Sequence, residues 1–210
     1  MILALNLNFS LDKIYTVDAL EYGGVVRAKA VQNTAGGKGA HIANICALLQ
    51  EDYIVTGFLG GRTGELIRDI MDRRAIRQDC VSINGETRSC INIGTPDGKQ
   101  TEVLEVGPEV TVDEEKQFLI KYDALLEQTD IVVGSGSLPK GIAVDFYGEL
   151  ITRAMRKGKR FLLDTSGKTL KAALRARPFL IKPNRDEIEA LTGHRIQSVK
   201  EAAVEVERFL

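Results

Sequence analysis

Residues 131–167 read IVVGSGSLPKGIAVDFYGELITRAMRKGKRFLLDTSG, and this stretch decides the fold. Its two ends, Ile131–Gly134 and Arg160–Asp164, contain nearly continuous apolar runs, which are typical of β-strands covered on both faces. Between them lies an apolar stripe with helical spacing, formed by Phe146, Leu150, Ile151 and Met155. A strand, a helix and a second strand in this order predict a parallel βαβ unit.

The same alternation continues on both sides of this unit. Further candidate strands are Ile2–Asn8, Tyr53–Leu59 and Phe179–Lys182, and the last of them is again an apolar run expected to be covered on both faces. A second helical stripe is formed by Ile42, Ile45, Cys46 and Leu49. The predicted fold class is therefore α/β, with a doubly wound parallel sheet.

Two stretches interrupt this alternation. Residues 10–32 show no helical stripe, and residues 86–106 read as a hairpin around the turn TPDG at residues 95–98. We expect both stretches to form one small β-sheet that covers the mouth of the α/β domain. The predicted organisation is an α/β core of residues 1–9, 33–85 and 107–210 with a β-lid of residues 10–32 and 86–106.

Composition limits the class of protein. The 210 residues include 28 Lys and Arg and 29 Asp and Glu, so the net charge is −1. This balance argues against a nucleic-acid binder with a broad basic face, although it leaves room for a small basic pocket. There is no signal-peptide pattern and no apolar run near the ~20 residues of a membrane helix. The scattered Cys46, Cys80 and Cys90 are typical of reduced thiols in a soluble, cytoplasmic protein.

A glycine-rich segment, NTAGGKGAH at residues 33–41, precedes the second helical stripe. Its glycines let backbone N–H groups approach a ligand at a helix N-terminus, where the helix dipole favours an anion or a polyhydroxylated molecule. It is not a Walker A loop, because Gly39 follows Lys38 where Ser or Thr is required, and the chain has no GxGxxG fingerprint. A glycine-rich turn with a solvated lysine remains the alternative.

Two further segments follow predicted strands. GSGSLPKG at residues 134–141 offers the Ser137 hydroxyl, and KPNRDE at residues 182–187 offers polar side chains. Ligands of open α/β sheets bind beyond the carboxyl ends of the strands, which favours a site here. The alternatives are an ordinary strand-to-helix loop and, for Asn184 and Glu187, a helix cap and a first-turn carboxylate. Ser137 lies in no GxSxG elbow, which argues against a hydrolase nucleophile.

Five segments together resemble the phosphofructokinase-B-type carbohydrate kinases of the ribokinase-like superfamily. They are LNFSLD at 7–12, AGGKG at 35–39, GSLPKG at 136–141, DTSG at 164–167 and KPNRDE at 182–187. The nearest branch resembles the sugar-phosphate kinases, among them 1-phosphofructokinase, tagatose-6-phosphate kinase and the minor 6-phosphofructokinase. The resemblance implies a ribokinase-like fold with a β-lid, ATP and Mg²⁺ as cofactors, and a homodimer formed through the lid.

The resemblance also implies roles for single residues. The sugar-phosphate site would be formed by Asp12, Arg27, Gly36, Gly37, Lys38, His41, Arg88 and Ser137. Within it, Arg27 and Arg88 would clamp the phosphate that the substrate already carries, for which guanidinium geometry is suited. The nucleotide side would be formed by Lys182, Asn184 and Glu187, with Glu187 acting indirectly on the metal. The sequence departs from the family pattern at Phe9, where proline is usual, and at His41, where asparagine is usual.

The family's Gly-Ala-Gly-Asp segment, whose aspartate takes the proton of the acceptor hydroxyl, does not occur in this sequence. The resemblance therefore identifies no catalytic residue, and we expect an N-terminal part of a kinase that is inactive alone. The activity implied for the complete protein is ATP-dependent phosphorylation of a ketohexose phosphate, with fructose 1-phosphate as the expected substrate. Alternatives are a tagatose-6-phosphate kinase, a non-catalytic sugar-phosphate-binding module and, disfavoured by the missing GxGxxG, a dinucleotide-dependent oxidoreductase.

Overall fold

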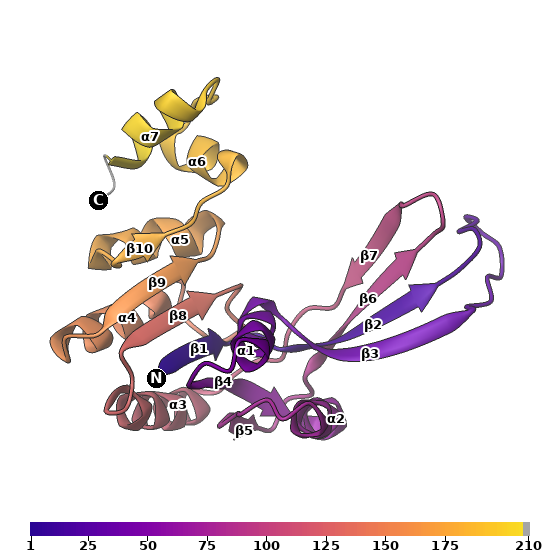
Figure 1. The fold of residues 1–210 in the computed structure, drawn as a ribbon, viewed down its shortest axis with the longest axis horizontal. Helices are drawn as coiled ribbons and strands as arrows, with labels where there is room; N and C mark the ends of the chain where they lie inside the picture. The colour runs from indigo at the N-terminus through magenta and orange to yellow at the C-terminus, as the bar shows by residue number, and fades with distance from the viewer. Residues whose placement is uncertain (208–210) are drawn as a thin grey trace.

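The computed structural model describes residues 1–207, which form a sheet-and-helix body and a projecting arm of strands (Figure 1). The body contains a six-stranded sheet in the order β10-β9-β8-β1-β4-β5, in which all neighbours are parallel. Its strands are β1 (Ile2–Asn6), β4 (Tyr53–Gly60), β5 (Val81–Ile83), β8 (Ile131–Ser135), β9 (Arg160–Asp164) and β10 (Leu180–Ile181). The predicted α/β class with a parallel sheet is confirmed.

Helices cover both faces of this sheet, as a doubly wound fold requires. Along β1, Leu3 and Leu5 pack with the helices at 112–126, 146–156 and 167–173 on one face, whereas Ala4 packs with the helices at 38–48 and 61–73 on the other. This division follows from the strand itself, because successive side chains point to opposite faces. The helices are α1 (Lys38–Leu48), α2 (Gly61–Arg73), α3 (Val112–Leu126), α4 (Phe146–Arg156), α5 (Gly167–Ala173), the 3₁₀ helix η1 (Leu174–Ala176), α6 (Arg185–Thr192) and α7 (Val199–Glu207).

The arm is a separate four-stranded sheet in the order β3-β2-β6-β7, which confirms the predicted lid and its hairpin. Its strands are β2 (Ser10–Thr16), β3 (Ala30–Gly36), β6 (Arg88–Gly94) and β7 (Gln100–Leu104). The sheet projects away from the body (Figure 1), so the lid stands open in this structure. Because β3 continues to Gly36, it also includes the first residues of the glycine-rich segment.

The predicted strand Phe179–Lys182 is present in the sheet, but it is shorter than predicted and is not covered on both faces. Only Leu180 and Ile181 form β10, and the side chains of Phe179 and Leu180 are 62% and 44% exposed. The reason is the position of this segment in the sheet. It is the last strand of the order within the described residues, so no neighbour covers its outer edge.

The predicted apolar stripe of α1 is only half correct, because Cys46 is buried and Ile42 packs against the core, whereas the other two residues do not. Ile45 and Leu49 are 53% and 68% exposed, whereas Ala40 and Ala43 are buried against the sheet. A Cβ on Gly39 would lie 2.4 Å from the carbonyl oxygen of Leu5, so α1 approaches β1 too closely for large side chains. Small residues therefore face the sheet where α1 is closest to β1, and Ile45 and Leu49 point outward.

Membrane-spanning segments would occur among the helices, and disulfide bonds among the cysteines. Within residues 1–207, no helix is both long enough and apolar enough to cross a membrane. All three cysteines are buried and free. Burial raises the pKa of the Cys80 thiol to about 12, so this thiol is protonated at neutral pH.

The strand order reverses beside β1. The chain passes from β1 to β4 on one side and later returns to β8 on the other side. Where the order reverses, the segments that follow two neighbouring strands leave in opposite directions and open a crevice at their carboxyl ends. The polar residues after β1 and β8 lie at this crevice, and the lid is attached there.

Candidate active site

Three sequence segments meet where β1 and β8 end. Asn8 Nδ2 donates a hydrogen bond to Ser137 Oγ at 3.1 Å, which links the segment after β1 to the segment after β8. Arg88, at the start of β6, donates to the carbonyl oxygens of Asn8 at 3.2 Å and of Glu105 at 3.3 Å. The fold thus brings the predicted Arg88 and Ser137 to one place, with Asn8 between them.

This junction retains unused polar groups. Arg88 Nε and Asn8 Oδ1 are buried atoms without a hydrogen-bond partner in the structure. Buried polar atoms are nearly always paired, so each exception requires an explanation. The unused Arg88 Nε–H can donate to a phosphate group, and the unused Asn8 Oδ1 can accept from a hydroxyl group. The junction therefore suits a ligand that carries both groups.

The glycine-rich segment lies against two polar side chains of the opening segment. A Cβ on Gly36 would stand 2.0 Å from Asp12 Oδ1, and a Cβ on Gly37, whose φ is +100°, would stand 2.3 Å from Asn6 Oδ1. Asn6 Nδ2 donates to the Gly36 carbonyl at 2.9 Å, and Ser10 Oγ donates to Asp12 Oδ1 at 2.6 Å. The glycines therefore let the N-terminus of α1 approach a fixed carboxylate, which places predicted Asp12, Gly36 and Gly37 together.

A substitution at Gly36 tests this close approach. We expect Gly36→Ala to displace the Asp12 carboxylate, to break its bond with Ser10 and to lower the free energy of unfolding by about 1–3 kcal/mol, the usual cost of overpacking. Gly24→Ala is the matched control, because a Cβ there meets only ordinary contacts at 3.5 Å. Urea unfolding checks both variants. Equal stabilities of the two variants would contradict the close approach.

Asp164, at the end of β9, joins two other segments. Lys38 Nζ lies 3.2 Å from Asp164 Oδ2, and Lys182 Nζ lies 3.3 Å from Asp164 Oδ1. One carboxylate between two ammonium groups leaves a net positive charge at this edge. Lys38, predicted for the sugar side, and Lys182, predicted for the nucleotide side, therefore pair with the same carboxylate. From the sequence, no role is predicted for this Asp164.

The loop after β8 is held by its neighbours. The hydroxyls of Tyr147 and Thr165 both donate to the Gly136 carbonyl, at 3.3 Å and 2.9 Å. Burial, and secondly the charge of Asp164, raise the pKa of the Tyr147 hydroxyl far above its usual value, so it remains a neutral donor. These bonds fix the backbone of the loop that carries Ser137.

Asn184 and Glu187 form a reciprocal helix cap. Asn184 Oδ1 accepts from the Glu187 backbone N–H, and Glu187 Oε2 accepts from the Asn184 backbone N–H, both at 2.9 Å. The predicted capping role of Asn184 is confirmed. Within residues 1–207 no group of three or more His, Cys, Asp or Glu side chains is placed to hold a metal ion. Magnesium in kinase sites takes few protein ligands, so nucleotide phosphates would have to supply most of its coordination.

Two predicted residues lie apart from the rest. Arg27 is exposed in the segment between β2 and β3, at the far end of the lid, whereas Arg88 pairs with Ser10 at its base. The seven residues of β2 separate these positions by about 20 Å, at roughly 3.3 Å per residue. His41 is exposed on α1 and lines, with Asn44 and Arg74, a cavity of about 310 Å³ beside the edge strand β3. Within one chain, Arg27 and Arg88 are therefore too far apart to bind the same phosphate group.

Sequence reasoning missed the roles of Asn6, Asn8 and Asp164. A signal was present, because each is a polar residue at or just after the carboxyl end of a buried strand. Their partners lie far away in the chain, as in the contact of Asn8 with Ser137, and such pairings are set by strand order rather than by local sequence.

Several solved structures have a similar fold. Phosphofructokinase-2 from Escherichia coli in complex with fructose-6-phosphate is 26% identical, with a TM-score of 0.90 over 99% of this chain and 69% of that chain. A possible 1-phosphofructokinase from Thermotoga maritima is 25% identical, with a TM-score of 0.91 over 99% of this chain and 68% of that chain. Ribokinase from Arabidopsis thaliana, at 21% identity and a TM-score of 0.75 over 99% of this chain and 67% of that chain, shares the fold.

The match extends to the sequence itself. The family described as pfkB family carbohydrate kinase matches residues 6–209, which is nearly the whole chain and includes all five segments described above. The lid, the glycine-rich N-terminus of α1 and the polar strand ends all fall inside this match. The chain therefore belongs to the pfkB family of carbohydrate kinases.

Proposed function

We propose that this chain forms the sugar-phosphate site of a kinase that converts fructose 1-phosphate to fructose 1,6-bisphosphate with ATP. The observation that carries the proposal is the junction of Arg88, Asn8 and Ser137 beside the Asp12 carboxylate and the glycine-rich N-terminus of α1. It combines a guanidinium group for a phosphate with a carboxylate and backbone N–H groups for sugar hydroxyls.

The residues act by positioning rather than by covalent chemistry. Asp12, held by Ser10, accepts hydrogen bonds from sugar hydroxyls, and Arg88 binds the phosphate that the substrate already carries. The N–H groups at the start of α1 place the positive end of the helix dipole beside the sugar. Phosphoryl transfer depends mainly on such positioning and on charge stabilisation.

The nucleotide side of the proposal rests on Lys182 and the start of α6. ATP with Mg²⁺ would supply the transferable phosphoryl group. Lys182, beside Asp164, contributes a positive charge at this edge. Glu187 has one oxygen in the helix cap, so its part in metal binding would be indirect, through the free oxygen. Asn184 acts as the cap that fixes this carboxylate.

The proposed lid contact is a homodimer. The lid face that carries Tyr15, Ile91 and Ile93 also carries Val31 and Val103, whose side chains are 54% and 55% exposed. A sheet of this size with an open apolar face is stabilised when that face is covered. In such a dimer, Arg27 of the second copy would approach the candidate site of the first copy. The first copy's own Arg27 does not reach that site.

A titration tests the proposed substrate. We expect calorimetry to show tighter binding of fructose 1-phosphate than of tagatose 6-phosphate, and much weaker binding of unphosphorylated fructose, because fructose lacks the partner of Arg88. Tighter binding of tagatose 6-phosphate would favour a tagatose-6-phosphate kinase. Absence of binding by all three sugars would contradict a sugar-phosphate site.

His41 is the residue by which sugar preference can be changed. We expect His41→Asn to alter the ratio of affinities for fructose 1-phosphate and tagatose 6-phosphate while changing the free energy of unfolding by less than about 0.5 kcal/mol, since the side chain is exposed. His194→Asn, at the only other histidine, is the control. An unchanged ratio with a lowered melting temperature would make His41 a structural residue at the start of α1.

A non-catalytic sugar-phosphate-binding module is the second candidate function. It requires only the binding groups of Asp12, Gly36 and Arg88, which lie at the crevice within the described residues. Both functions predict binding, so only turnover separates them.

A further inference from the structure

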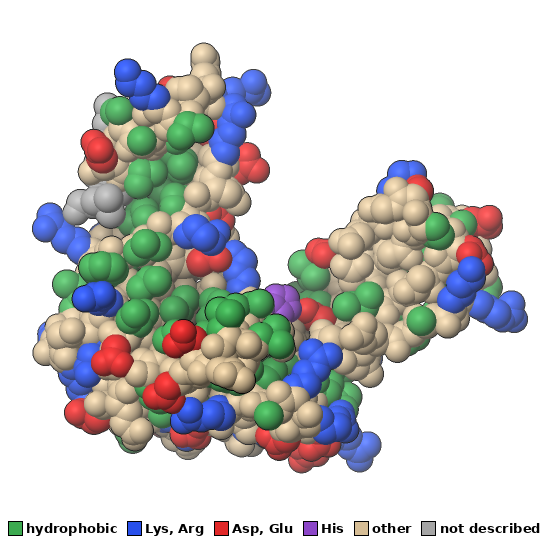
Figure 2. All heavy atoms as spheres, in the orientation of Figure 1, with side chains coloured by type: hydrophobic (Ala, Val, Ile, Leu, Met, Phe, Trp, Pro, Cys, Tyr) green, Lys and Arg blue, Asp and Glu red, His purple; other side chains and the backbone are tan. Residues whose placement is uncertain are grey.

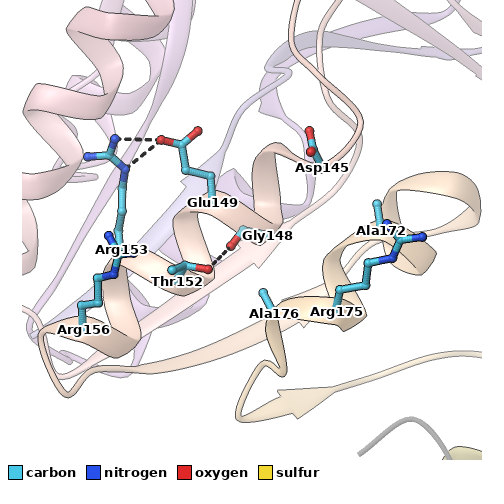
Figure 3. Close-up of a pocket in the computed structure, with 9 residues that line it drawn as sticks. All are labelled: Asp145, Gly148, Glu149, Thr152, Arg153, Arg156, Ala172, Arg175 and Ala176. Atoms are coloured by element: carbon cyan, nitrogen blue, oxygen red, sulfur yellow. Dashed lines mark hydrogen bonds and ion pairs between the residues drawn. The ribbon is translucent and has the colours of Figure 1, made fainter.

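A groove between α4 and the α5–η1 segment lies away from the candidate active site. It has a volume of about 590 Å³, within the usual range for small-molecule sites. Figure 3 shows α4 on one side of it and Ala172, Arg175 and Ala176 on the other. α4 and α5 cover the sheet face opposite to α1, so this groove and the glycine-rich segment lie on different sides of the sheet.

The middle of the groove consists of small residues. Gly148 and Thr152 of α4 face Ala172 and Ala176, and a Cβ on Gly148 would meet neighbours only at 3.9 Å or more. The Thr152 hydroxyl donates to the Gly148 carbonyl at 2.8 Å, which leaves its oxygen free to accept. These small residues form the floor of the groove, so a ligand can lie on it and find a polar atom at Thr152.

Arginines flank this middle part from both helical segments. Arg153 is held in place by Glu149 at 2.7 Å and by Asp123 at 2.6 Å. By contrast, the exposed side chains of Arg156 and Arg175 make no hydrogen bond or ion pair within residues 1–207. In Figure 3, Arg156 and Arg175 lie on opposite sides of the small residues. The groove thus offers two separate unpaired guanidinium groups.

Cations in the last turn of a helix are common, because they complement the helix dipole. That effect explains each arginine separately, and it does not explain the charge of the whole region. Residues 153–177 contain nine Lys or Arg residues and a single acidic residue, Asp164, in a chain whose net charge is −1. Residues 153–177 therefore carry a local excess of positive charge, and three of these basic residues, Arg153, Arg156 and Arg175, line the groove.

We propose that this groove binds a small polyhydroxylated molecule that carries a phosphate group at each end. One phosphate pairs with Arg156 and the other with Arg175, and the hydroxyl-bearing part lies over Gly148 and Thr152. Asp145, at the other end of the α4 side, accepts hydrogen bonds from hydroxyl groups. Sugar bisphosphates are the chemical class that fits, since two guanidinium groups on opposite walls match two separated dianions.

Residue-resolved NMR of the 15N-labelled chain, titrated with fructose 1,6-bisphosphate, tests the proposal. We expect the backbone signals of Gly148, Thr152 and Ala176 and the Nε–Hε signals of Arg156 and Arg175 to shift. Inorganic phosphate should bind at least about tenfold more weakly, because it occupies one end only. Signals of Gly36 and Ser137 report separately on the candidate active site, so failure of the proposed function and failure of this proposal are distinguishable.

Two double variants separate a built site from a diffuse charge. Arg156→Ala with Arg175→Ala should weaken binding at the groove by about 100-fold, roughly tenfold for each lost charge-assisted bond. Lys159→Ala with Lys171→Ala removes the same charge outside the groove lining and should weaken binding less than about threefold. Ala172→Glu places a carboxylate inside the groove and should block the ligand without removing an arginine.

Three results would overturn the proposal. Equal weakening by the two double variants would show a non-specific basic surface. Equal affinity for inorganic phosphate and the bisphosphate would exclude a ligand held at both ends. Shifts confined to the strand carboxyl ends would leave the groove without a ligand. The decisive result is no shift at Gly148 or Thr152 at about 10 mM ligand, a concentration that detects dissociation constants up to about 10 mM.

Discussion

A protein of these 210 residues is expected to bind a ketohexose phosphate and to phosphorylate it at less than about one ten-thousandth of an ordinary kinase rate. A positioned general base contributes about 10²–10⁴-fold, and one preorganised donor at the developing charge contributes about 10²–10³-fold. The segment that carries both in the family does not occur in this sequence. The residues proposed to bind the sugar phosphate, among them Asp12, Gly36 and Arg88, are present, so binding should persist.

A coupled ATP-turnover assay on the pure chain, with fructose 1-phosphate, measures this loss. Calorimetry on the same sample is the control that the protein is folded and binds the sugar phosphate. Turnover near 1 s⁻¹, at the low end of kinase rates, would contradict the prediction. It would mean that a carboxylate of this chain acts as the base, and Asp12→Asn and Asp164→Asn would then identify which one.

Arg88→Ala is expected to weaken binding of fructose 1-phosphate by about 10–150-fold, the equivalent of roughly 1.5–3 kcal/mol for a lost charge-assisted hydrogen bond. The Arg88 guanidinium is anchored to the Asn8 and Glu105 carbonyls and keeps a buried Nε unused. The phosphate group that we propose as its partner exists only in the phosphorylated sugar. Binding of unphosphorylated fructose should therefore change little, and calorimetry compares the two sugars.

Arg27→Ala is the matched control for Arg88→Ala. At protein concentrations where the chain is monomeric by sedimentation, it should have no effect, because Arg27 lies at the far end of the lid. An effect that grows with the dimer fraction would support delivery of Arg27 by a second copy. Equal losses for fructose and fructose 1-phosphate in Arg88→Ala would exclude the phosphate role of Arg88.

The fold class was predictable from the sequence because its signals are local. The apolar runs at 131–134 and 160–164 fix two strands, and the turn at 95–98 fixes the lid hairpin. Burial faces were less predictable. Two of the four residues of the predicted α1 stripe, Ile45 and Leu49, are exposed, because the close approach of Gly39 to Leu5 favours small residues on the face toward the sheet.

The sequence by itself determined which chemical groups the site contains. The helix cap of Asn184 and Glu187 is an interaction between residues three apart, so it could be predicted locally. The glycines at 36 and 37 belong to a segment with a recognisable pattern. Only the tertiary structure decided which of these groups meet. Asn8 reaches Ser137, and Lys38 reaches Asp164, because strand order places β8 beside β1 and β9 beside β8. It also separated Arg27 from Arg88, since a β-strand is stiff and extended and holds its two ends about 20 Å apart.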